Sequence, residues 1–264
     1  MNIQGEGTKE HTYDAIVVGS GISGGWAAKE LSEKGLNTLV LERGRDVKHG
    51  DYPTAHMEPW EFAGRGAKDQ EILLRQKKQD RTGYTTHHAS AHWFVDDVDN
   101  PYSEDQPVDW MRGYHVGGRS LLWGRQSYRL SELDFQANAK DGFGVDWPIR
   151  YKDIAPWYDY VESFAGISGS NEGLLQLPDG KFLPPMEMTC VETHVRQSIE
   201  SSFNNRTMII GRVANLTQPH NGRGNCQFRN RCIRGCPYGA YFSSNASTLP
   251  AGFASGNLTL RPFS

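Results

Sequence analysis

Residues 13–25 read Tyr-Asp-Ala-Ile-Val-Val-Gly-Ser-Gly-Ile-Ser-Gly-Gly, and residues 38–42 read Thr-Leu-Val-Leu-Glu. The apolar run at 15–18 is typical of a buried strand, and Gly19, Gly21 and Gly24 follow it at the spacing G-x-G-x-x-G. Small and apolar residues then recur at helical spacing over 22–34, and Gly35 supplies a stop. This stretch predicts a strand, a phosphate loop, a helix and a second strand over 38–41.

Each glycine of this loop has a separate task in a dinucleotide site. Gly19 permits the tight turn, Gly21 lets the backbone approach a pyrophosphate, and Gly24 lets helix and strand pack closely. The start of the helix offers free N–H groups and the positive end of its dipole. Glu42, at the end of the second strand, is placed to bind a ribose hydroxyl and to repel a 2′-phosphate, which favours NAD or FAD over NADP. The alternative is a glycine turn with no ligand.

The cofactor-binding residues expected in this first part of the chain form one short list. They are Gly19, Ser20, Gly21, Ile22, Ser23, Gly24, Glu42 and Arg43.

Composition favours a small-molecule partner. The chain has 264 residues, 37% hydrophobic content and a net charge of −3, enough for one large or two modest domains. Its 28 basic and 31 acidic residues are dispersed, which argues against nucleic-acid binding and against a polybasic membrane anchor. The polar start lacks an apolar signal-peptide core, and no stretch approaches the length of a membrane span. We therefore expect no membrane insertion and a cytoplasmic location, with export on a partner's signal (to the periplasm) as the alternative.

A long polar segment follows the nucleotide-binding stretch. Residues 51–109 are rich in charge and contain scattered prolines, which is typical of a lid or a subunit-contact excursion. His87, His88 and His92 lie within it, and i, i+4 spacing can place two histidines on one helix face. Because the surroundings are loop-like and no carboxylate stands at ligand spacing before Asp96, we favour a solvated or flavin-flanking loop over a metal site.

A second glycine-rich segment occupies residues 110–125. It reads Trp-Met-Arg-Gly-Tyr-His-Val-Gly-Gly-Arg-Ser-Leu-Leu-Trp-Gly-Arg, so Gly117, Gly118 and Gly124 surround Ser120 and Trp123. Such a loop can bring backbone and a small hydroxyl close to a second part of the cofactor. The alternative is a turn that packs against the first loop.

The remainder is expected to divide into further segments. An amphipathic helix is predicted over about 154–165, with Trp157, Tyr158, Val161 and Phe164 forming a buried stripe. The expected organisation is a dinucleotide-binding Rossmann βαβ unit at 1–50, the excursion at 51–109, a second cofactor-contacting segment at 110–150, part of a second domain at 151–215, a cysteine-rich segment at 216–250, and a return to the dinucleotide-binding domain at 251–264.

The two glycine motifs, in this order, resemble those of the glucose–methanol–choline (GMC) family of FAD-dependent oxidoreductases. The likeness also includes Leu-Glu-Arg-Gly at 41–44, Trp-Pro-Ile at 147–149 and the cysteine segment below. It implies an α/β fold: a Rossmann-like FAD-binding domain with part of a second, substrate-binding α+β domain. It also implies that FAD is the cofactor, and that the isoalloxazine or ribityl chain is contacted by Gly117, Gly118, Ser120, Trp123 and Gly124.

Two departures from the family pattern lead to further expectations. Some relatives attach the flavin covalently through a histidine just before the tryptophan of the second motif, but this chain has Leu122 there, so the resemblance implies non-covalent FAD. The family's catalytic histidine and its partner lie near the C-terminus of a chain about twice as long. The chain therefore resembles the N-terminal half of such an enzyme; it is expected to be inactive alone, and its catalytic residues are unknown.

Three cysteines cluster at 226–236. Cys226, Cys232 and Cys236 have the spacing C-x5-C-x3-C in a polar loop, whereas Cys190 lies apart. Clustered cysteines in a cytoplasmic protein favour metal ligation over disulfides, and three do not complete a four-ligand zinc site. The segment resembles that of bacterial FAD-dependent glucose dehydrogenases, which implies a [3Fe–4S] cluster. The alternative is a structural turn without iron.

The resemblance implies oxidation of a CH–OH group in a sugar, glycoside or other alcohol, with electrons passed to a carrier such as an acceptor subunit or a cytochrome. Three rival functions remain open at this point: an NAD-dependent dehydrogenase, a flavin and iron–sulfur electron-transfer subunit, and a non-catalytic FAD-binding protein.

Overall fold

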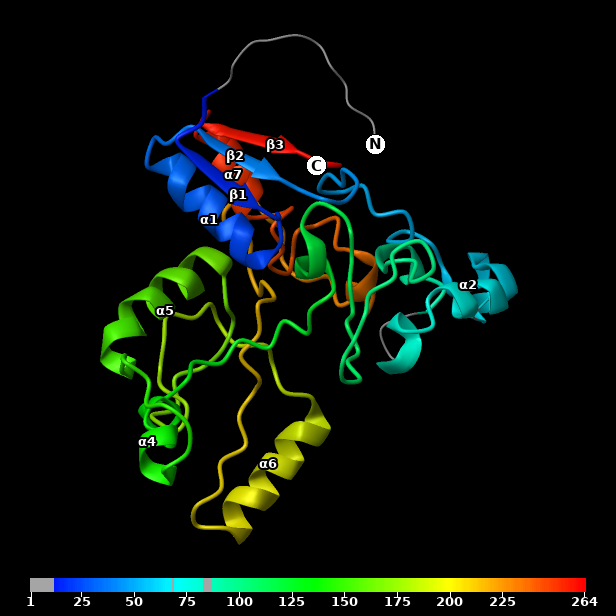
Figure 1. The fold of residues 1–264 in the computed structure, drawn as a ribbon. Helices are drawn as coiled ribbons and strands as arrows, with labels where there is room; N and C mark the ends of the chain where they lie inside the picture. The colour runs from blue at the N-terminus through cyan, green and yellow to red at the C-terminus, as the bar shows by residue number, and fades with distance from the viewer. Residues whose placement is uncertain (1–11, 68, 83–86) are drawn as a thin grey trace. The chain divides into compact units, whose positions relative to one another are not determined.

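The computed structural model describes residues 12–67, 69–82 and 87–264, and the chain forms two compact units (Figure 1). The first unit contains the residues up to Lys48, together with Met57–Leu121 and Ser243–Ser264. The second contains His49–His56 and Leu122–Phe242. No helix within the described ranges is long and apolar enough to cross a membrane.

The first unit is built on a parallel three-stranded sheet in the order β1-β2-β3. The strands are β1 (Ala15–Val18), β2 (Thr38–Leu41) and β3 (Leu258–Arg261). Helix α1 (Ile22–Glu33) connects β1 to β2, and α7 (Thr248–Ala254) precedes β3 and packs against α1. The Rossmann-like βαβ arrangement predicted from the sequence is therefore confirmed, with a third strand contributed from the end of the chain.

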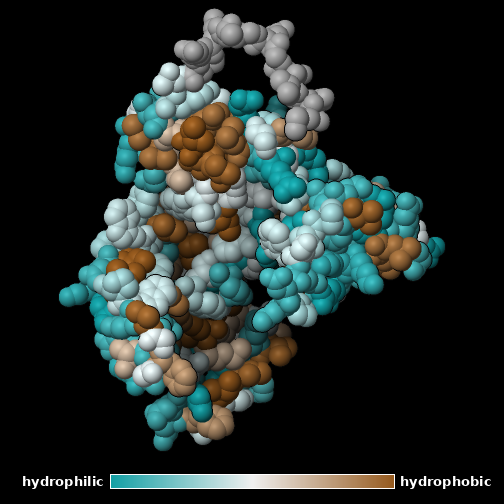
Figure 2. Space-filling model, in the orientation of Figure 1, coloured by the Kyte–Doolittle hydropathy of each residue, from teal (hydrophilic) through white to brown (hydrophobic). Residues whose placement is uncertain are grey.

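One face of this sheet carries the apolar core of the unit. Val17 and Val40 face each other in register and pack with Ala28 of α1, and two leucines of β3 extend the cluster, Leu258 and Leu260. Side chains alternate between the two faces along a strand. The residues on either side of Val17 therefore point the other way, and Ile16 and Val18 are 61% and 84% exposed. Figure 2 shows an apolar patch over this end of the unit.

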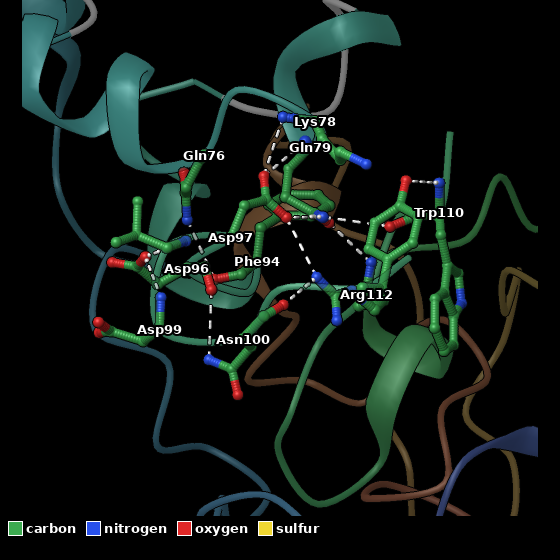
Figure 3. A network of polar contacts seen from close by, with 12 residues as sticks. Gln76, Lys78, Gln79, Phe94, Asp96, Asp97, Asp99, Asn100, Trp110 and Arg112 are labelled. Atoms are coloured by element: carbon green, nitrogen blue, oxygen red, sulfur yellow. Dashed lines mark hydrogen bonds and ion pairs between the residues drawn. The ribbon is translucent and has the colours of Figure 1, made fainter. Parts of the chain in front are cut away.

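The rest of the first unit combines buried apolar side chains, among them Trp93, Phe94 and Val95, with a network of polar contacts. It contains α2 (Gln70–Arg75) and short 3-10 turns at Pro59–Glu61, Ala63–Gly66, Gln79–Thr82, Ala91–Trp93 and Gly118–Leu121. The Asp97 carboxylate accepts hydrogen bonds from the Lys78 backbone (2.9 Å), the Gln79 amide (2.8 Å) and the Arg112 guanidinium (3.1 Å) (Figure 3). This network ties the segment at residues 78–79 to Arg112, which leads into the second glycine motif.

The second unit contains four helices: α3 (Glu132–Phe135), α4 (Ala137–Asp141), α5 (Tyr151–Ala165) and α6 (Cys190–Ser202). A 3-10 turn at Cys232–Arg234 lies in the cysteine segment, and strand pairing among the described residues of this unit consists of isolated bridges. The sequence predicted a buried apolar stripe on α5, which is wrong, since Trp157 is 63% and Val161 is 38% exposed while Tyr158 and Phe164 are half-buried. The side chains that α5 buries are those of Glu162 and Ala165.

An ion pair with Arg129 allows the charged Glu162 of α5 to be buried. The Arg129 guanidinium donates to the Glu162 carboxylate at 2.8 Å and to the Tyr151 hydroxyl at 2.9 Å, and it also pairs with Asp159. The Lys181 backbone N–H supplies a further hydrogen bond to Glu162. A carboxylate can lie in a core when its acceptors are matched in this way.

Candidate dinucleotide site and cysteine cavity

The first glycine loop has the geometry that a dinucleotide site requires. Gly19 has a φ of +89°, which favours glycine, and a Cβ on Gly24 would lie 1.9 Å from the carbonyl oxygen of Gly19. These positions therefore need glycine for the turn and for close packing of helix on strand. A Cβ on Gly21 would meet nothing within 4 Å, so the space in front of this residue is open.

The open space lies at the N-terminus of α1. Gly21 is the N-cap residue, it contributes no side-chain cap, and Ile22 and Ser23 begin the first turn with their side chains exposed. The first i to i−4 bond of the helix runs from the Gly25 N–H to the Gly21 carbonyl. The N–H groups that precede it have no helical partner and are directed as in an anion site.

Glu42 is buried and accepts three hydrogen bonds from the protein itself. Ser20 supplies two of them, from its N–H (3.0 Å) and its hydroxyl, and the Gly44 N–H supplies the third (2.8 Å). A carboxylate offers about four acceptor positions, so one remains for a ribose hydroxyl. The expected ribose contact is thus compatible with the structure, and the side chain has a second task, which is to tie the loop to the end of β2.

The second glycine segment lies against the first loop. The Ser20 hydroxyl accepts a hydrogen bond from the Gly117 N–H at 2.9 Å, and a Cβ built on Gly118 would lie 3.6 Å from the Cα of Gly21. Just before these glycines, His115 forms a parallel bridge with Arg45, which follows β2. The structure therefore brings together two glycine motifs that are about 100 residues apart in the sequence.

The other predicted members of the second motif are placed differently. Ser120 is buried, and its hydroxyl donates to the Gly117 carbonyl (2.6 Å) and accepts from the Ser244 N–H (3.0 Å), so it holds the loop closed. Trp123 and Gly124 belong to the second unit, where the Trp123 indole donates to the Phe242 carbonyl at 2.9 Å.

Arg43 is an exposed residue at the end of β2. Its guanidinium lies 4.1 Å from the centre of the Tyr114 ring, so it stacks on the segment that leads into the second glycine motif.

Sequence reasoning missed the contribution of residues 243–247. Ser244 and Asn245 both hydrogen-bond to the second glycine segment, although they fall within the cysteine-rich segment predicted at 216–250. The signal that could have identified them is the run Ser-Ser-Asn-Ala-Ser immediately before a helix.

Two histidines of the first unit lie beside Trp93, of which His115 is fully buried and His92 is half-buried. Burial lowers the pKa of His115 and that of His92 to about 4, and the nearby Arg45 cation acts in the same direction. Both are therefore neutral at pH 7. Among the residues described by the structure, no group of three His, Cys, Asp or Glu side chains that could hold a metal ion is found.

The three clustered cysteines line one cavity of the second unit, with a volume of about 270 Å3. Met186, Asn215 and Tyr241 share its wall, and the Phe228 N–H donates to the Cys226 sulfur at 3.4 Å. Burial raises the pKa of the Cys232 thiol. The fourth cysteine is exposed on α6.

The cavity offers the thiol donors that an iron–sulfur centre requires, but the three sulfur atoms are not arranged as ligands of one metal site in the described structure. All four cysteines are free thiols, and over the described ranges no group of three His, Cys, Asp or Glu side chains is drawn together as a metal site. A physical reason is that metal ligands are drawn together by the ion they bind, and a preformed site is rare without it. The metal site predicted at Cys226, Cys232 and Cys236 stays a prediction.

Comparison with known proteins supports the nucleotide-binding reading of the first motif. The model of the NAD(P)-binding Rossmann-like domain matches residues 17–48. The 6'''-hydroxyparomomycin C oxidase of Streptomyces lividus is 26% identical over 259 residues, which cover 97% of this chain and 41% of the oxidase. The fructose dehydrogenase large subunit of Gluconobacter japonicus is 25% identical over 259 residues, with 90% and 43% covered.

Further similarities are more restricted. The gluconate 2-dehydrogenase flavoprotein of Pantoea cypripedii is 29% identical over 172 residues, which cover 60% of this chain and 26% of that protein. Among solved structures, pyridoxine 4-oxidase from Mesorbium loti aligns over 94% of this chain with 16% identity and a TM-score of 0.44, which is too low to carry an argument about the fold. The chain spans about two fifths of the length of the first two relatives. The resemblance to GMC-type oxidoreductases is confirmed over most of the chain.

Proposed function

We propose that this chain, a relative of the GMC-type oxidoreductases, binds FAD non-covalently through the two glycine loops of its first unit. One observation carries the proposal: the Gly117 N–H bonds to Ser20, and Gly118 lies beside Gly21, in front of the open N-terminus of α1. A Rossmann loop alone would serve NAD equally well. The second loop adds a backbone surface next to the pyrophosphate position, as expected for a longer contact with a flavin dinucleotide.

The residues of this chain would bind and orient the cofactor. The first-turn N–H groups of α1 face the pyrophosphate position, and the remaining acceptor of Glu42 serves a ribose hydroxyl. Bound flavin supplies hydride acceptance from a C–H bond. Leu122 provides no nucleophilic side chain for a covalent flavin link. We assign no catalytic base to this chain.

The substrate class in this proposal is a sugar, a glycoside or a related alcohol. It is supported by the names of the relatives, which include a paromamine 6'-oxidase, a fructose dehydrogenase and a gluconate dehydrogenase. The final acceptor in this proposal is an electron carrier or acceptor subunit; the support is that two of these relatives are dehydrogenases, named as a large subunit and as a flavoprotein. Oxygen is the alternative acceptor, because two other relatives are named oxidases.

The finer part of the proposal is a [3Fe–4S] cluster at Cys226, Cys232 and Cys236. The support is the spacing of the cysteines, their place around one cavity and the N–H donated to the Cys226 sulfur, since Fe–S clusters use thiolate ligands and are tuned by such hydrogen bonds. The alternative to the cluster is a structural turn without iron.

The alternatives to an alcohol-oxidising function are a flavin and iron–sulfur electron-transfer subunit that works with a separate catalytic chain, and an FAD-binding protein without turnover.

The test is flavin binding by the purified chain. We expect a yellow protein with about one FAD per chain, and a dissociation constant for FAD that is much lower than that for NAD, measured by fluorescence titration of the apoprotein. Equal affinity for the two dinucleotides, or no bound flavin, would contradict the proposal. Co-purification of a second chain that restores sugar-dependent dye reduction would favour the electron-transfer subunit.

A further inference from the structure

A short turn just before α7, residues 243–247, packs against the second glycine loop and against Gly25 of α1. Ser244 is fully buried and Asn245 is 4% exposed, although both are polar residues between two structural elements. Polar side chains that are this deeply buried are expected to make specific hydrogen bonds. The partners of Asn245 are therefore informative about its task.

The Asn245 amide joins two segments that are far apart in the sequence. Its Nδ2 donates to the Val47 carbonyl at 2.7 Å and to the Val116 carbonyl at 3.2 Å. Val47 follows β2, and Val116 precedes the glycines of the second motif. One carboxamide thus fixes the second glycine loop to the chain that leaves the sheet.

The oxygen of the same carboxamide packs on the second loop itself. A Cβ on Gly117 would lie 1.6 Å from Asn245 Oδ1, so this oxygen occupies the space that a side chain at position 117 would take. Next to it, the Ser244 N–H donates to the Ser120 hydroxyl, which donates to the Gly117 carbonyl. Gly117 is consequently held from one side by this turn and from the other by Ser20.

Asn245 Oδ1 is buried and has no hydrogen-bond partner among the residues that the structure describes. A buried acceptor of this kind is uncommon and calls for an explanation. Contact with the Cα of Gly117 gives it a packing role. Asn245 Oδ1 also presents a hydrogen-bond acceptor beside the second glycine loop, which the proposed function places along the flavin dinucleotide.

We propose that Asn245 is a positioning residue of the dinucleotide site, which sets the spacing of the two glycine loops and thereby the affinity for a flavin dinucleotide. The inference rests on the proposed function. Asn245 adds a second reason for glycine at position 117, beside the φ of +84° at that position, and the loop spacing then depends on a residue more than 120 positions away. Asn245 itself is not assigned a contact with reacting atoms.

The test compares two substitutions of Asn245 with a matched control in the same stretch. Asn245→Asp keeps the size and replaces the donor with an acceptor that faces two carbonyls, and Asn245→Ser is a milder loss of both contacts. Thr248→Val is the control, because Thr248 is equally buried and its hydroxyl lacks a partner among the described residues. FAD dissociation constants are measured by fluorescence quenching well below the melting temperature of each apoprotein.

We expect both Asn245 variants to bind FAD at least tenfold more weakly, with a shifted absorption band for the flavin that remains bound, and Thr248→Val to bind as the wild type does. A merely structural role would lower the melting temperature without changing affinity or band shape in the folded protein. That result, in either Asn245 variant, would overturn the inference while wild-type binding upheld the proposed function. Wild-type protein that binds no FAD would overturn both.

Discussion

Replacing Gly21 or Gly24 of the first loop with alanine should have different effects, one on ligand binding and the other on folding. A Cβ on Gly21 meets nothing within 4 Å, and the residue has a φ of −64° and a ψ of −168°, which any L-residue adopts. A Cβ on Gly24 lies 1.9 Å from a backbone oxygen and 2.9 Å from a backbone carbon of Gly19. Gly21→Ala should therefore fold normally and block the ligand, whereas Gly24→Ala should disturb the fold.

The size of each effect follows from these contacts. Gly21→Ala should cost less than about 1 kcal/mol of unfolding free energy, because it changes only an N-cap without a side-chain bond. Gly24→Ala should cost about 3 kcal/mol or more, because backbone atoms cannot yield to an overpacked methyl. The Gly21 methyl stands where N–H groups would approach a phosphate, and hydrogen bonds to charged groups contribute about 1.5–3 kcal/mol each. We therefore expect FAD affinity to fall by about 10- to 100-fold.

Urea unfolding of the apoproteins and FAD titration of the folded variants separate the two outcomes. For a chain of this length, 1 kcal/mol corresponds to roughly 2–4 °C in melting temperature, so thermal scans give a second measure. Wild-type affinity in folded Gly21→Ala would refute the assignment of the open space to the ligand. A Gly24→Ala protein as stable as Gly21→Ala would refute the packing argument.

Four other outcomes are expected. Arg129→Ala leaves the buried Glu162 carboxylate without its cation and should lower the unfolding free energy by about 3–5 kcal/mol, and a loss below 1 kcal/mol in urea titrations would contradict this. The pKa of His115 is about 4 in the folded protein against 6.5 in the unfolded chain, so on acidification the unfolded chain takes up a proton at this imidazole first. The unfolding free energy is therefore unaffected above pH 6.5 and falls by about 3 kcal/mol in total towards pH 4, and His115→Asn should reduce this loss in pH-dependent urea titrations. Acid precipitation should release all flavin into the supernatant, because Leu122 stands where covalently linked relatives carry histidine, and flavin in the pellet would contradict this. Anaerobically purified protein should contain iron and sulfide that are lost when any cysteine of the cavity is replaced by serine, whereas iron well below one atom per chain would favour a structural role for these cysteines.

The βαβ unit could be predicted because its determinants are local. The strand at 15–18 and the strand at 38–41 agree with the structure residue for residue, because each reads as a short apolar, β-branched run. The expected burial holds for β2 but is wrong for β1, where Val17 is buried while Ile16 and Val18 are exposed. The glycine spacing located the loop, and the stop at Gly35 gave the end of the helix to within two residues. Patterns of this kind can be recognised from the sequence because the strand, the loop, the helix and the second strand are consecutive and contact one another in the fold.

The errors arose where tertiary partners decide burial. The period of α5 is helical, but Trp157 is exposed while Glu162 is buried, because Arg129 supplies a cation from outside the helix. The polar segment before the second motif showed no periodicity, and hydrogen bonds around Asp97 hold part of it. Neither partnership leaves a repeat in the sequence that a window of ten to fifteen residues can detect.

The candidate site shows why a nucleotide motif is only part of a nucleotide site. Ser20 was selected for its place between two glycines, yet its hydroxyl is buried and links the Glu42 carboxylate to the Gly117 N–H. One small side chain therefore couples the end of β2, the first loop and the second loop. Substitution of Ser20 by alanine would remove both links at once while leaving the G-x-G-x-x-G spacing intact. The spacing identifies the loop, and contacts from distant segments give the loop its shape.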